Sequence, residues 1–469
     1  MTPPNIVFVM ADDHAAHAIG AYGSRINKTP GIDRLAAEGM RFDACFCTNS
    51  ICAPSRATIL TGTYNHVNGV TTLDTLFDAR QTAFPGILRD AGYQTALVGK
   101  WHLGHGGIHD PVGFDFWSVL PDQGDYHDPT FLEAGGRSLV RRGYVTDVIT
   151  DLAIDWVGAR DPDRPFLALV HHKAPHRAWE PAERHATLYE DRDIAEPPTL
   201  RDDYVGRSTA AVEARMRLWD LNAEDLKAVV PPHLTEDEEL RWRYQRYIKD
   251  YLRCVAALDE NVARLLDFLD DEGLTEETVV VYTSDQGFFL GDHGWFDKRF
   301  MYEESLRMPL LVRYPSEVAP GSASDAIVLN VDFAQTFLDL AGVEPRRRMQ
   351  GRSLRPLLRG ETPGDWRRSM YYRYWMHLDG SHGVWAHRGV RTRHHKLVHY
   401  YNAALGQPGA RDAPRPEEWE LFDLEADPWE LRSLHDDPTQ AGLLGELREE
   451  LERLSADVRD IAPGNVIPR

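Results

Sequence analysis

Five short runs of apolar, largely β-branched residues punctuate the chain, and polar residues follow each of them. The runs cover residues 5–11, 95–99, 165–170, 278–284 and 308–314. Within each run the apolar character is continuous rather than alternating. This pattern favours strands that are covered on both faces, as in a parallel sheet.

Segments with helical periodicity lie between these runs. We expect one helix to begin at Thr29-Pro30 and to stop at Gly39, because Pro suits the first turn of a helix and Gly suits its end. A longer helix is predicted from about Arg241 to Glu272. Its apolar residues recur at steps of three and four on one helical face, namely Tyr244, Tyr247, Tyr251, Val255, Leu258, Val262, Leu265 and Leu269. Strands that alternate with helices predict an α/β fold with a large, mostly parallel sheet sandwiched by helices.

The character of the sequence changes after Pro363-Gly364. Aromatic, polar and basic residues crowd together there, with strand-like pieces at VWAHRGVRT and KLVHYY and an expected helix near Leu443–Leu454. We therefore predict a large domain over residues 1–363, with an irregular surface excursion at about 177–240. A smaller α+β subdomain with an antiparallel sheet is predicted over residues 364–469.

Composition narrows the class of protein. The chain has 469 residues, and 52 Lys+Arg against 73 Asp+Glu give a formal net charge of −21, which argues against a nucleic-acid-binding protein. The four cysteines (Cys45, Cys47, Cys52, Cys254) are too few and too clustered for a disulfide scaffold.

No apolar run approaches the roughly 18–20 residues of a membrane-spanning helix. The first residues, MTPPNIVFVMADD, lack the basic segment of a secretory signal, so a cytoplasmic location is expected. The sequence does not indicate an oligomeric state.

Chemically active residues follow four of the five predicted strands. In open α/β sheets, ligands bind outside the carboxyl ends of the strands, so these residues are expected to converge on one rim. They are Asp12, Asp13 and His14; Lys100 and His102; His171, His172, Lys173 and His176; and Asp285, Gln286, His293 and Lys298.

Three of these residues, Asp12, Asp13 and Asp285, form a set of hard oxygen donors. Like charges a few ångströms apart repel strongly in a poorly screened site, so such a set requires a cation or protonation. A divalent ion with oxygen ligands, Ca²⁺ or Mg²⁺, satisfies this requirement. The alternative is that the paired aspartates cap a helix and that Asp285 belongs to a turn.

Cys52 lies just before a predicted helix that Pro54 opens. The N-terminus of a helix offers unpaired N–H groups and a positive dipole end, and Arg56 is one turn further on. A cysteine in this position is expected to have a lowered pKa and to act as a thiolate nucleophile. The alternative is a buried structural cysteine.

The pentapeptide CAPSR at residues 52–56 resembles the C-x-P-S-R signature of type I sulfatases, which belong to the alkaline-phosphatase-like superfamily. Further segments resemble that family in its order over nearly the whole chain: NIVFVMADDH, GKWHLG, KAPH, SDQGFFLGDHGWFDKR and ELFDLEADPWE. The resemblance implies a sulfuric ester hydrolase with an alkaline-phosphatase-like fold. It also implies that a formylglycine-generating enzyme converts Cys52 to formylglycine, and that residues 1–363 form the catalytic domain.

The resemblance also implies roles for individual residues. Asp12, Asp13, Asp285 and Gln286 match the metal-ligand positions, with the modified Cys52 reaching the same ion, Ca²⁺ or alternatively Mg²⁺. The position of Gln286 is often Asn or His in the family, so this residue departs from the pattern. The positions that hold the sulfate and move protons are matched by Arg56, Lys100, His102, His176 and Lys298. We expect His176 to act as the acid and His102 as the base, although exchanging them fits the sequence equally well.

The substrate is indicated less directly. The stretch FLGDHGWFDKRFMYEESLRMPLLVRYP resembles sulfatases of carbohydrates, including the N-acetylglucosamine-6-sulfatase branch, so a small sulfated carbohydrate is expected. Aromatic and basic residues of the C-terminal region either form a sugar-binding wall or pack as its core: Trp375, His377, His387 and Arg391. The alternative functions are a phosphonate monoester or phosphodiester hydrolase, an aryl- or choline-type sulfatase, and a catalytically silent anion-binding protein.

Overall fold

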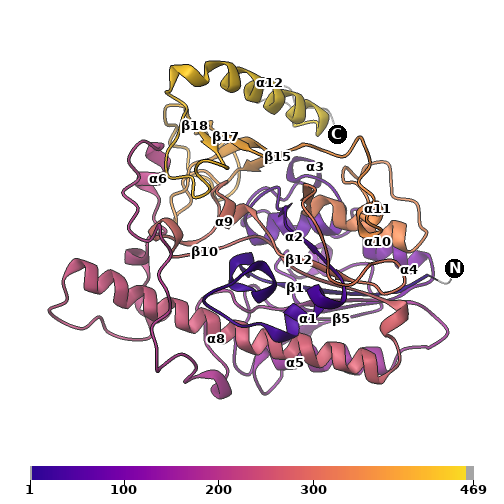
Figure 1. Cartoon of the computed structure of the whole chain (residues 1–469). Helices are drawn as coiled ribbons and strands as arrows, with labels where there is room; N and C mark the ends of the chain where they lie inside the picture. Colours follow the sequence, from indigo (N-terminus) through magenta and orange to yellow (C-terminus); the bar gives the residue numbers. More distant parts are fainter. Residues whose placement is uncertain (1–2, 461–469) are drawn as a thin grey trace.

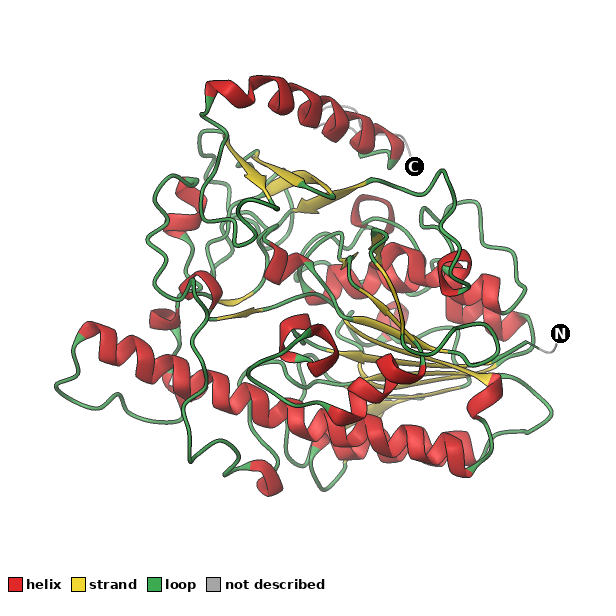
Figure 2. Ribbon diagram, viewed as in Figure 1, coloured by secondary structure: helices red, strands yellow, loops and turns green. Residues whose placement is uncertain are grey.

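A ten-stranded mixed sheet forms the centre of the molecule in the computed structural model, which describes residues 3–460 (Figures 1 and 2). The strand order is β13-β2-β12-β9-β1-β8-β4-β5-β6-β7. In chain order these strands are β1 (Asn5–Ala11), β2 (Met40–Phe42), β4 (Gln94–Lys100), β5 (Phe116–Leu120), β6 (Thr130–Glu133), β7 (Arg137–Val140), β8 (Phe166–His171), β9 (Thr278–Ser284), β12 (Leu310–Arg313) and β13 (Ser322–Ser324).

The centre of the sheet is parallel, as the sequence predicts. β1 lies between β8 and β9 and runs parallel to both, with Phe8 opposite Leu169 on one side and Val281 on the other. The fifth predicted strand, β12, is different because it runs antiparallel to β9 and to β2. The chain returns from β9 through a short β-hairpin and one helical turn, α9 (Glu303–Leu306), rather than through a long crossover helix. A continuous apolar run indicates burial, but it carries no information on strand direction.

Helices cover both faces of this sheet. Alternate residues of β1 point to opposite sides, so Phe8 packs in one core and Val9 in the other. The core containing Phe8 is formed with α2 (Cys52–Thr61), α4 (Phe84–Asp90) and α10 (Phe333–Leu340). The core containing Val9 is formed with α1 (Pro30–Glu38), α5 (Val145–Gly158) and α8 (Glu236–Asp271) (Figure 1). The predicted α/β architecture is confirmed.

The two predicted long helices are present. α1 begins at Pro30 and ends at Glu38, directly before Gly39. α8 begins five residues before the predicted start, because the Thr235 side chain accepts a hydrogen bond from Glu238 N while Glu238 caps Thr235 N in return. The acidic first turn that follows suits the positive end of the helix dipole.

Residues 177–235 contain only short helical turns, including α6 (Thr209–Glu213) and α7 (Ala223–Leu226). Other short elements include α3 (Asn65–Asn68), α11 (Arg355–Leu358) and two small strand pairs. The pairs are β3 (Cys45–Phe46) with β14 (Val328–Leu329) and β10 (Phe289–Leu290) with β11 (Phe296–Asp297).

A second, antiparallel sheet lies in the C-terminal part of the chain. It has the order β15 (Ser369–Tyr374), β16 (His387–Thr392), β17 (His395–Tyr400) and β18 (Glu418–Asp423). α12 (Ala441–Asp457) packs on this sheet, at the top of Figure 1. The predicted antiparallel sheet and terminal helix are confirmed, while the division of the chain at residue 363 stays a prediction.

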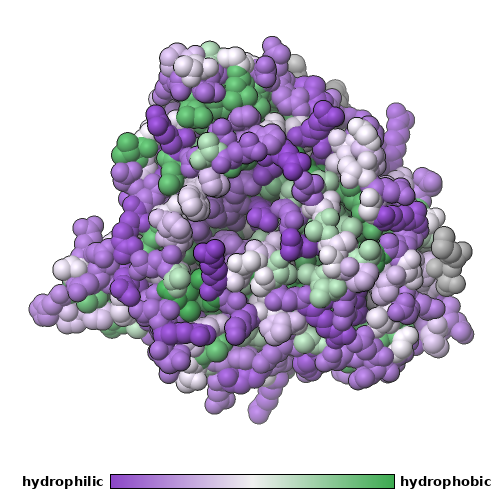
Figure 3. Space-filling model, in the orientation of Figure 1, coloured by the Kyte–Doolittle hydropathy of each residue, from purple (hydrophilic) through white to green (hydrophobic). Residues whose placement is uncertain are grey.

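The outer surface is largely hydrophilic on the face seen in Figure 3, where hydrophobic residues form scattered patches. Among residues 3–460 no helix combines the length and the apolar character needed to cross a membrane.

Candidate active site

The central strands β1 and β9 bring three carboxylates together. Ala11 at the end of β1 pairs with Ser284 at the end of β9, so the next residues of both strands leave the sheet side by side. These residues are Asp12, Asp13 and Asp285, and their carboxylate oxygens lie within 4.8 Å of one another. All three side chains are buried.

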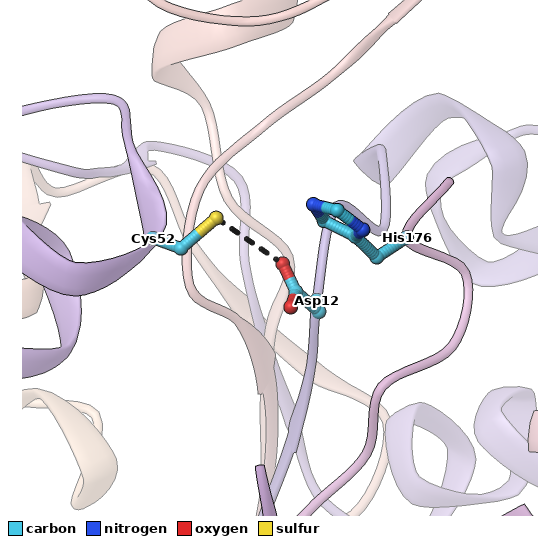
Figure 4. A group of neighbouring side chains, drawn as sticks. All are labelled: Asp12, Cys52 and His176. Carbon is cyan, nitrogen blue, oxygen red and sulfur yellow. Dashed lines mark hydrogen bonds between the residues drawn. The ribbon is translucent and has the colours of Figure 1, made fainter. Parts of the chain in front are cut away.

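Helix α2 brings Cys52 and Arg56 to the same place. Cys52 is the first helical residue, and its Sγ lies 3.5 Å from Asp12 Oδ1 (Figure 4). Arg56 follows one turn later, and its Nε donates to Asp285 Oδ2 at 3.0 Å. The helix N-terminus therefore lies directly beside the carboxylates that follow β1 and β9.

The expected lowering of the Cys52 pKa is wrong. Burial raises the pKa of the Cys52 thiol, and the negative charge of Asp12 raises it further, although Lys298 and Lys100 oppose this effect. The free energy lost when a thiolate is removed from water exceeds the stabilisation that the dipole at a helix N-terminus gives it. The unmodified thiol is therefore poorly suited to act as a nucleophile here.

Two lysines neutralise the two neighbouring aspartates. Lys100, the last residue of β4, forms an ion pair with Asp12, and its Nζ is fully buried. Lys298 Nζ donates to Asp13 Oδ1 at 2.5 Å. Burial alone would lower the pKa of Lys298, but Asp13 keeps this pKa well above its usual value.

His176 approaches the carboxylates from the loop after β8. A ring nitrogen of His176, a carboxylate oxygen of Asp12 and the Sγ of Cys52 lie within 4.8 Å of one another. In Figure 4 the imidazole lies on the opposite side of Asp12 from Cys52. Nδ1 lies 2.8 Å from the carbonyl oxygen of Arg177, and since a carbonyl only accepts, Nδ1 carries the proton. Burial and the charge of Lys100 hold the pKa of His176 well below its usual value.

His102 lies near the same charged groups. Burial, followed by the charge of Lys100, lowers its pKa well below the usual range. Its Nε2 lies 3.1 Å from the side-chain amide nitrogen of Gln123, a residue that the sequence did not single out.

The donor set fits a divalent cation with oxygen ligands. Burial and the repulsion from Asp12 and Asp285 raise the pKa of Asp13 to about 7 despite the opposing charge of Lys298. Burial and the charge of Asp12 raise the pKa of Asp285 to about 6. Gln286 reaches the cluster as well, with Nε2 2.5 Å from Asp13 Oδ1, while its buried Oε1 has no hydrogen-bond partner among the described residues. Crowded carboxylates and an unsatisfied amide oxygen are what a Ca²⁺ or Mg²⁺ site provides.

The four candidate side chains of the C-terminal region, for which sugar binding and core packing were both left open, have partners within the protein. Arg391 forms an ion pair with Glu303 at 3.0 Å, and its guanidinium lies 4.3 Å from the centre of the Phe46 ring. His387 is fully buried and stacks on Tyr372 and Tyr374.

The remaining two members of that set make similar contacts within the protein. His377 receives a hydrogen bond from Ala386 N at 3.1 Å, and Trp375 is covered by the guanidinium of Arg373 at 3.6 Å from the ring centre. These contacts favour the alternative that the four residues pack as a core. A role in sugar binding stays a prediction.

Two charged residues next to Lys298, Asp297 and Arg299, were given no role in the sequence analysis, and His382 was considered only as part of the C-terminal aromatic and basic region. Asp297 Oδ1 lies 3.5 Å from Arg299 Nε, and Asp297 Oδ2 lies 3.3 Å from His382 Nε2, which comes from the loop after β15. Arg299 is 3% exposed and retains two nitrogens without hydrogen-bond partners in the described part of the chain. The Asp-Lys-Arg triplet at residues 297–299 was the signal in the sequence from which Asp297 and Arg299 could have been found.

Comparison with known proteins gives consistent matches. The Sulfatase family model matches residues 4–343, and a model described as N-sulphoglucosamine sulphohydrolase, C-terminal, matches residues 291–457. The chain is 43% identical over 98% of its length, and 88% of the relative, to an N-acetylglucosamine-6-O-sulfatase of Bacteroides thetaiotaomicron. It is 28% identical to human N-acetylglucosamine-6-sulfatase, over 79% of this chain and 67% of the human protein.

Solved structures match over nearly the whole chain as well. One protein, solved in complex with its substrate D-glucosamine-2-N,6-O-disulfate, has a TM-score of 0.91 and 42% identity and covers 98% of this chain and 99% of its own. The phosphonate monoester hydrolase of Agrobacterium radiobacter has a TM-score of 0.75, covering 97% of this chain and 96% of its own, but only 22% identity, so it shares the fold.

Proposed function

Because this chain belongs to the sulfatase family, we propose that it hydrolyses a sulfate ester of a carbohydrate, specifically the 6-O-sulfate of a glucosamine unit. The observation that carries the proposal is the convergence of Cys52, Asp12 and His176, whose ligand atoms lie within 4.8 Å of one another. The choice of sugar is supported by the 43% identical relative and by the 42% identical structure solved with a glucosamine disulfate.

The nucleophile in this proposal is formylglycine at position 52, made from Cys52 by a formylglycine-generating enzyme. When hydrated, this group supplies two hydroxyls on one carbon, which permits attack on sulfur and later release of sulfate without a permanent sulfo-enzyme. The setting of Cys52 supports the need for such a conversion, since burial raises the pKa of its thiol and leaves the unmodified cysteine poorly suited to act as the nucleophile. Serine at this position would carry only one hydroxyl and unmodified cysteine carries none, so neither could release sulfate in this way.

The proposed metal ligands are Asp12, Asp13, Asp285 and Gln286, together with the modified residue 52. A bound Ca²⁺ or Mg²⁺ would polarise a sulfate oxygen and lower the pKa of the attacking hydroxyl. Gln286 would contribute its amide oxygen, which is buried without a hydrogen-bond partner among the described residues.

Three cationic side chains surround these carboxylates, and we assign to them the binding of the sulfate group. Arg56, Lys100 and Lys298 are all buried, and each contacts one or two of the aspartates. Positive groups fixed in a poorly hydrated site stabilise the charge that develops on sulfate oxygens in the transition state. Their burial makes that stabilisation larger than it would be in water.

His176 is the residue that we assign to proton transfer to the departing sugar oxygen. Its Nδ1 is occupied by the carbonyl of Arg177, so Nε2, 3.8 Å from Asp13 Oδ2, is the ring atom free to exchange a proton. An anionic ester bound beside the ring favours the imidazolium form that such a transfer requires.

The test begins with protein coexpressed with a formylglycine-generating enzyme. Mass spectrometry of the peptide containing residue 52 is expected to show loss of the cysteine sulfur. The modified protein is then offered defined glucosamine and galactosamine sulfates, and released sulfate is measured by anion chromatography. Hydrolysis of glucosamine 6-O-sulfate, abolished in Cys52→Ala, is expected. Activity on nitrophenyl phosphonate or phosphate diesters with no sugar sulfate hydrolysed would overturn the proposal.

A further inference from the structure

Tyr251 lies on the long helix α8, and its side chain touches both segments that carry the proposed metal ligands. The residue is fully buried. Its hydroxyl contacts the backbone that follows β1, at Asp13 and Ala15. Its ring stacks on Phe288, two residues after Gln286, with the ring centres 5.8 Å apart. One side chain of a covering helix therefore contacts both ligand-bearing loops.

The Tyr251 hydroxyl bridges two backbone groups on either side of His14. It donates to the carbonyl oxygen of Asp13 at 2.8 Å and accepts from Ala15 N at 2.9 Å. A carbonyl only accepts and a backbone N–H only donates, so both bonds fix the hydroxyl proton towards Asp13. Neither backbone group has another hydrogen-bond partner among residues 3–460. The hydroxyl thus closes this turn of the backbone.

This turn directs two consecutive aspartates at the same place. In a strand, successive side chains point to opposite faces, so Asp12 and Asp13 could not both reach one ion if β1 continued. The chain leaves the strand instead, and Asp13 has a left-handed φ of +68°. Aspartate tolerates this conformation better than most residues, but the right-handed region remains more favourable. The left-handed conformation therefore depends on support from the contacts around it.

We propose that Tyr251 is a positioning residue of the metal site, and that its hydroxyl holds the backbone of Asp13 so that this carboxylate stays beside those of Asp12 and Asp285. The inference rests on the proposed function and deepens it. Without the hydroxyl, two buried backbone groups lose their partner and the turn relaxes towards other conformations. A smaller fraction of the protein then has the carboxylates in place, so the apparent affinity for a cation falls.

Tyr251→Phe tests the inference, because it removes the hydroxyl and keeps the ring that packs on Phe288. Ca²⁺ and Mg²⁺ are titrated separately into chelator-treated full-length protein, coexpressed with a formylglycine-generating enzyme, in an isothermal titration calorimeter. We expect the Kd of the tighter-binding ion to rise about tenfold or more.

Tyr244→Phe is the matched control. Tyr244 lies two turns earlier on the same buried face of α8, and its hydroxyl donates to the carbonyl oxygen of Ala195 at 2.7 Å, away from the carboxylates. Its Kd is expected to stay within about twofold of the wild-type value.

Two further measurements separate positioning from a general loss of stability. Tyr251→4-aminophenylalanine returns an N–H donor to the carbonyl oxygen of Asp13 and is expected to recover most of the affinity lost in Tyr251→Phe. Raising the cation concentration above the new Kd is expected to return kcat of Tyr251→Phe on glucosamine 6-O-sulfate to near the wild-type value, because the cation selects the competent conformation. A misfolded site would not recover in this way.

A Kd of Tyr251→Phe within about twofold of wild type, or an equal rise in Tyr244→Phe, would overturn the inference and leave the metal assignment intact. Wild-type protein that bound neither cation would overturn both. If wild-type protein bound a cation but released sulfate from no ester, the proposed function would fail, while the calorimetric comparison would still decide the role of Tyr251.

Discussion

Arg56 contacts Asp285 through both Nε, at 3.0 Å, and Nη2, at 2.9 Å, and both contacts end on the same carboxylate oxygen, Oδ2. The second oxygen, Oδ1, accepts only a long hydrogen bond of 3.3 Å from Asp13 N among the described residues. Arg56 thus neutralises one side of the carboxylate. The other side remains available to a cation.

Arg56→Met is expected to destabilise the protein as well as to abolish activity. The substitution leaves the buried carboxylate of Asp285 without its charge partner, which typically costs about 3 kcal/mol. Urea unfolding at pH 7 measures this loss. Arg453→Met is the matched control, because Arg453 pairs with Glu450 and Asp457 at a site where its side chain is 55% exposed, and such pairs contribute less than about 1 kcal/mol. Equal losses in the two variants would contradict the prediction.

A divalent cation is expected to stabilise the folded protein. Three buried carboxylates within 4.8 Å repel one another, and a cation bound only in the folded state relieves this repulsion. At a concentration about 100-fold above Kd, the stabilisation is about 2.7 kcal/mol, and Tm of a chain of this length rises by about 3 °C. We expect thermal melts of chelator-treated protein to show this rise with Ca²⁺ or Mg²⁺.

Asp13→Asn should reduce that cation-dependent rise in Tm to about 1 °C or less, since it removes one charged ligand. Asp436→Asn alters a fully exposed carboxylate and is expected to leave the rise unchanged. The metal assignment would be wrong if Asp13→Asn protein responded to the cation as wild type does.

His387 is expected to make the protein sensitive to mild acid. Burial lowers the pKa of His387 to about 4, while the unfolded chain titrates near 6.5. Because the folded state binds this proton less readily, stability is lost as the pH falls below about 6.5. Between pH 7 and pH 5 the loss from this residue is about 2 kcal/mol.

His387→Gln should remove that part of the pH dependence. Urea unfolding of both proteins at pH 7 and pH 5 gives the difference. His394→Gln replaces a histidine whose side chain is 47% exposed and serves as the control. An unchanged pH dependence in His387→Gln would show that this ring is not held neutral by burial.

Gly99 is expected to tolerate no side chain. It precedes Lys100 and has a φ of +95°, and a Cβ at this position would overlap the backbone carbonyl oxygen of His171 in the neighbouring strand. Gly99→Ala should cost about 3 kcal/mol or more and displace Lys100, so activity falls with stability. Gly92→Ala is the matched control, because Gly92 has a φ of +100° but open space around the Cβ position. Similar losses of unfolding free energy in the two variants would mean that φ alone decides the cost.

The parts of the fold that the sequence predicted best are those buried on both sides. β1 and β9 have the bounds expected from their apolar runs, because strands inside a parallel sheet carry apolar residues at every position. β7, whose four residues are all exposed, gives no such signal, and β15 mixes aromatic with polar residues. The direction of a strand could not be predicted from the sequence either, since β12 has a continuous apolar run and yet runs antiparallel to β9.

For the candidate site, the carboxylates and lysines could be predicted because each follows a strand or belongs to a family motif. Gln123 could not be predicted, since a glutamine in a turn is common and its position depends on the pairing of β4 with β5. The pKa of Cys52 was misjudged for a related reason. The helix start is visible in the sequence, but the depth at which the thiol is buried is a property of the assembled structure.

The pairing of β1 with β9 also means that the site cannot assemble until late in the synthesis of the chain. Asp13 and Asp285 are separated by 272 positions, so at about 5–20 residues per second a ribosome delivers the second carboxylate roughly 14 to 54 seconds after the first. Throughout that interval the layer that finally encloses Cys52 is incomplete. An enzyme that modifies this cysteine would therefore have access to it during that interval, before β9 joins the sheet and the side chain is buried.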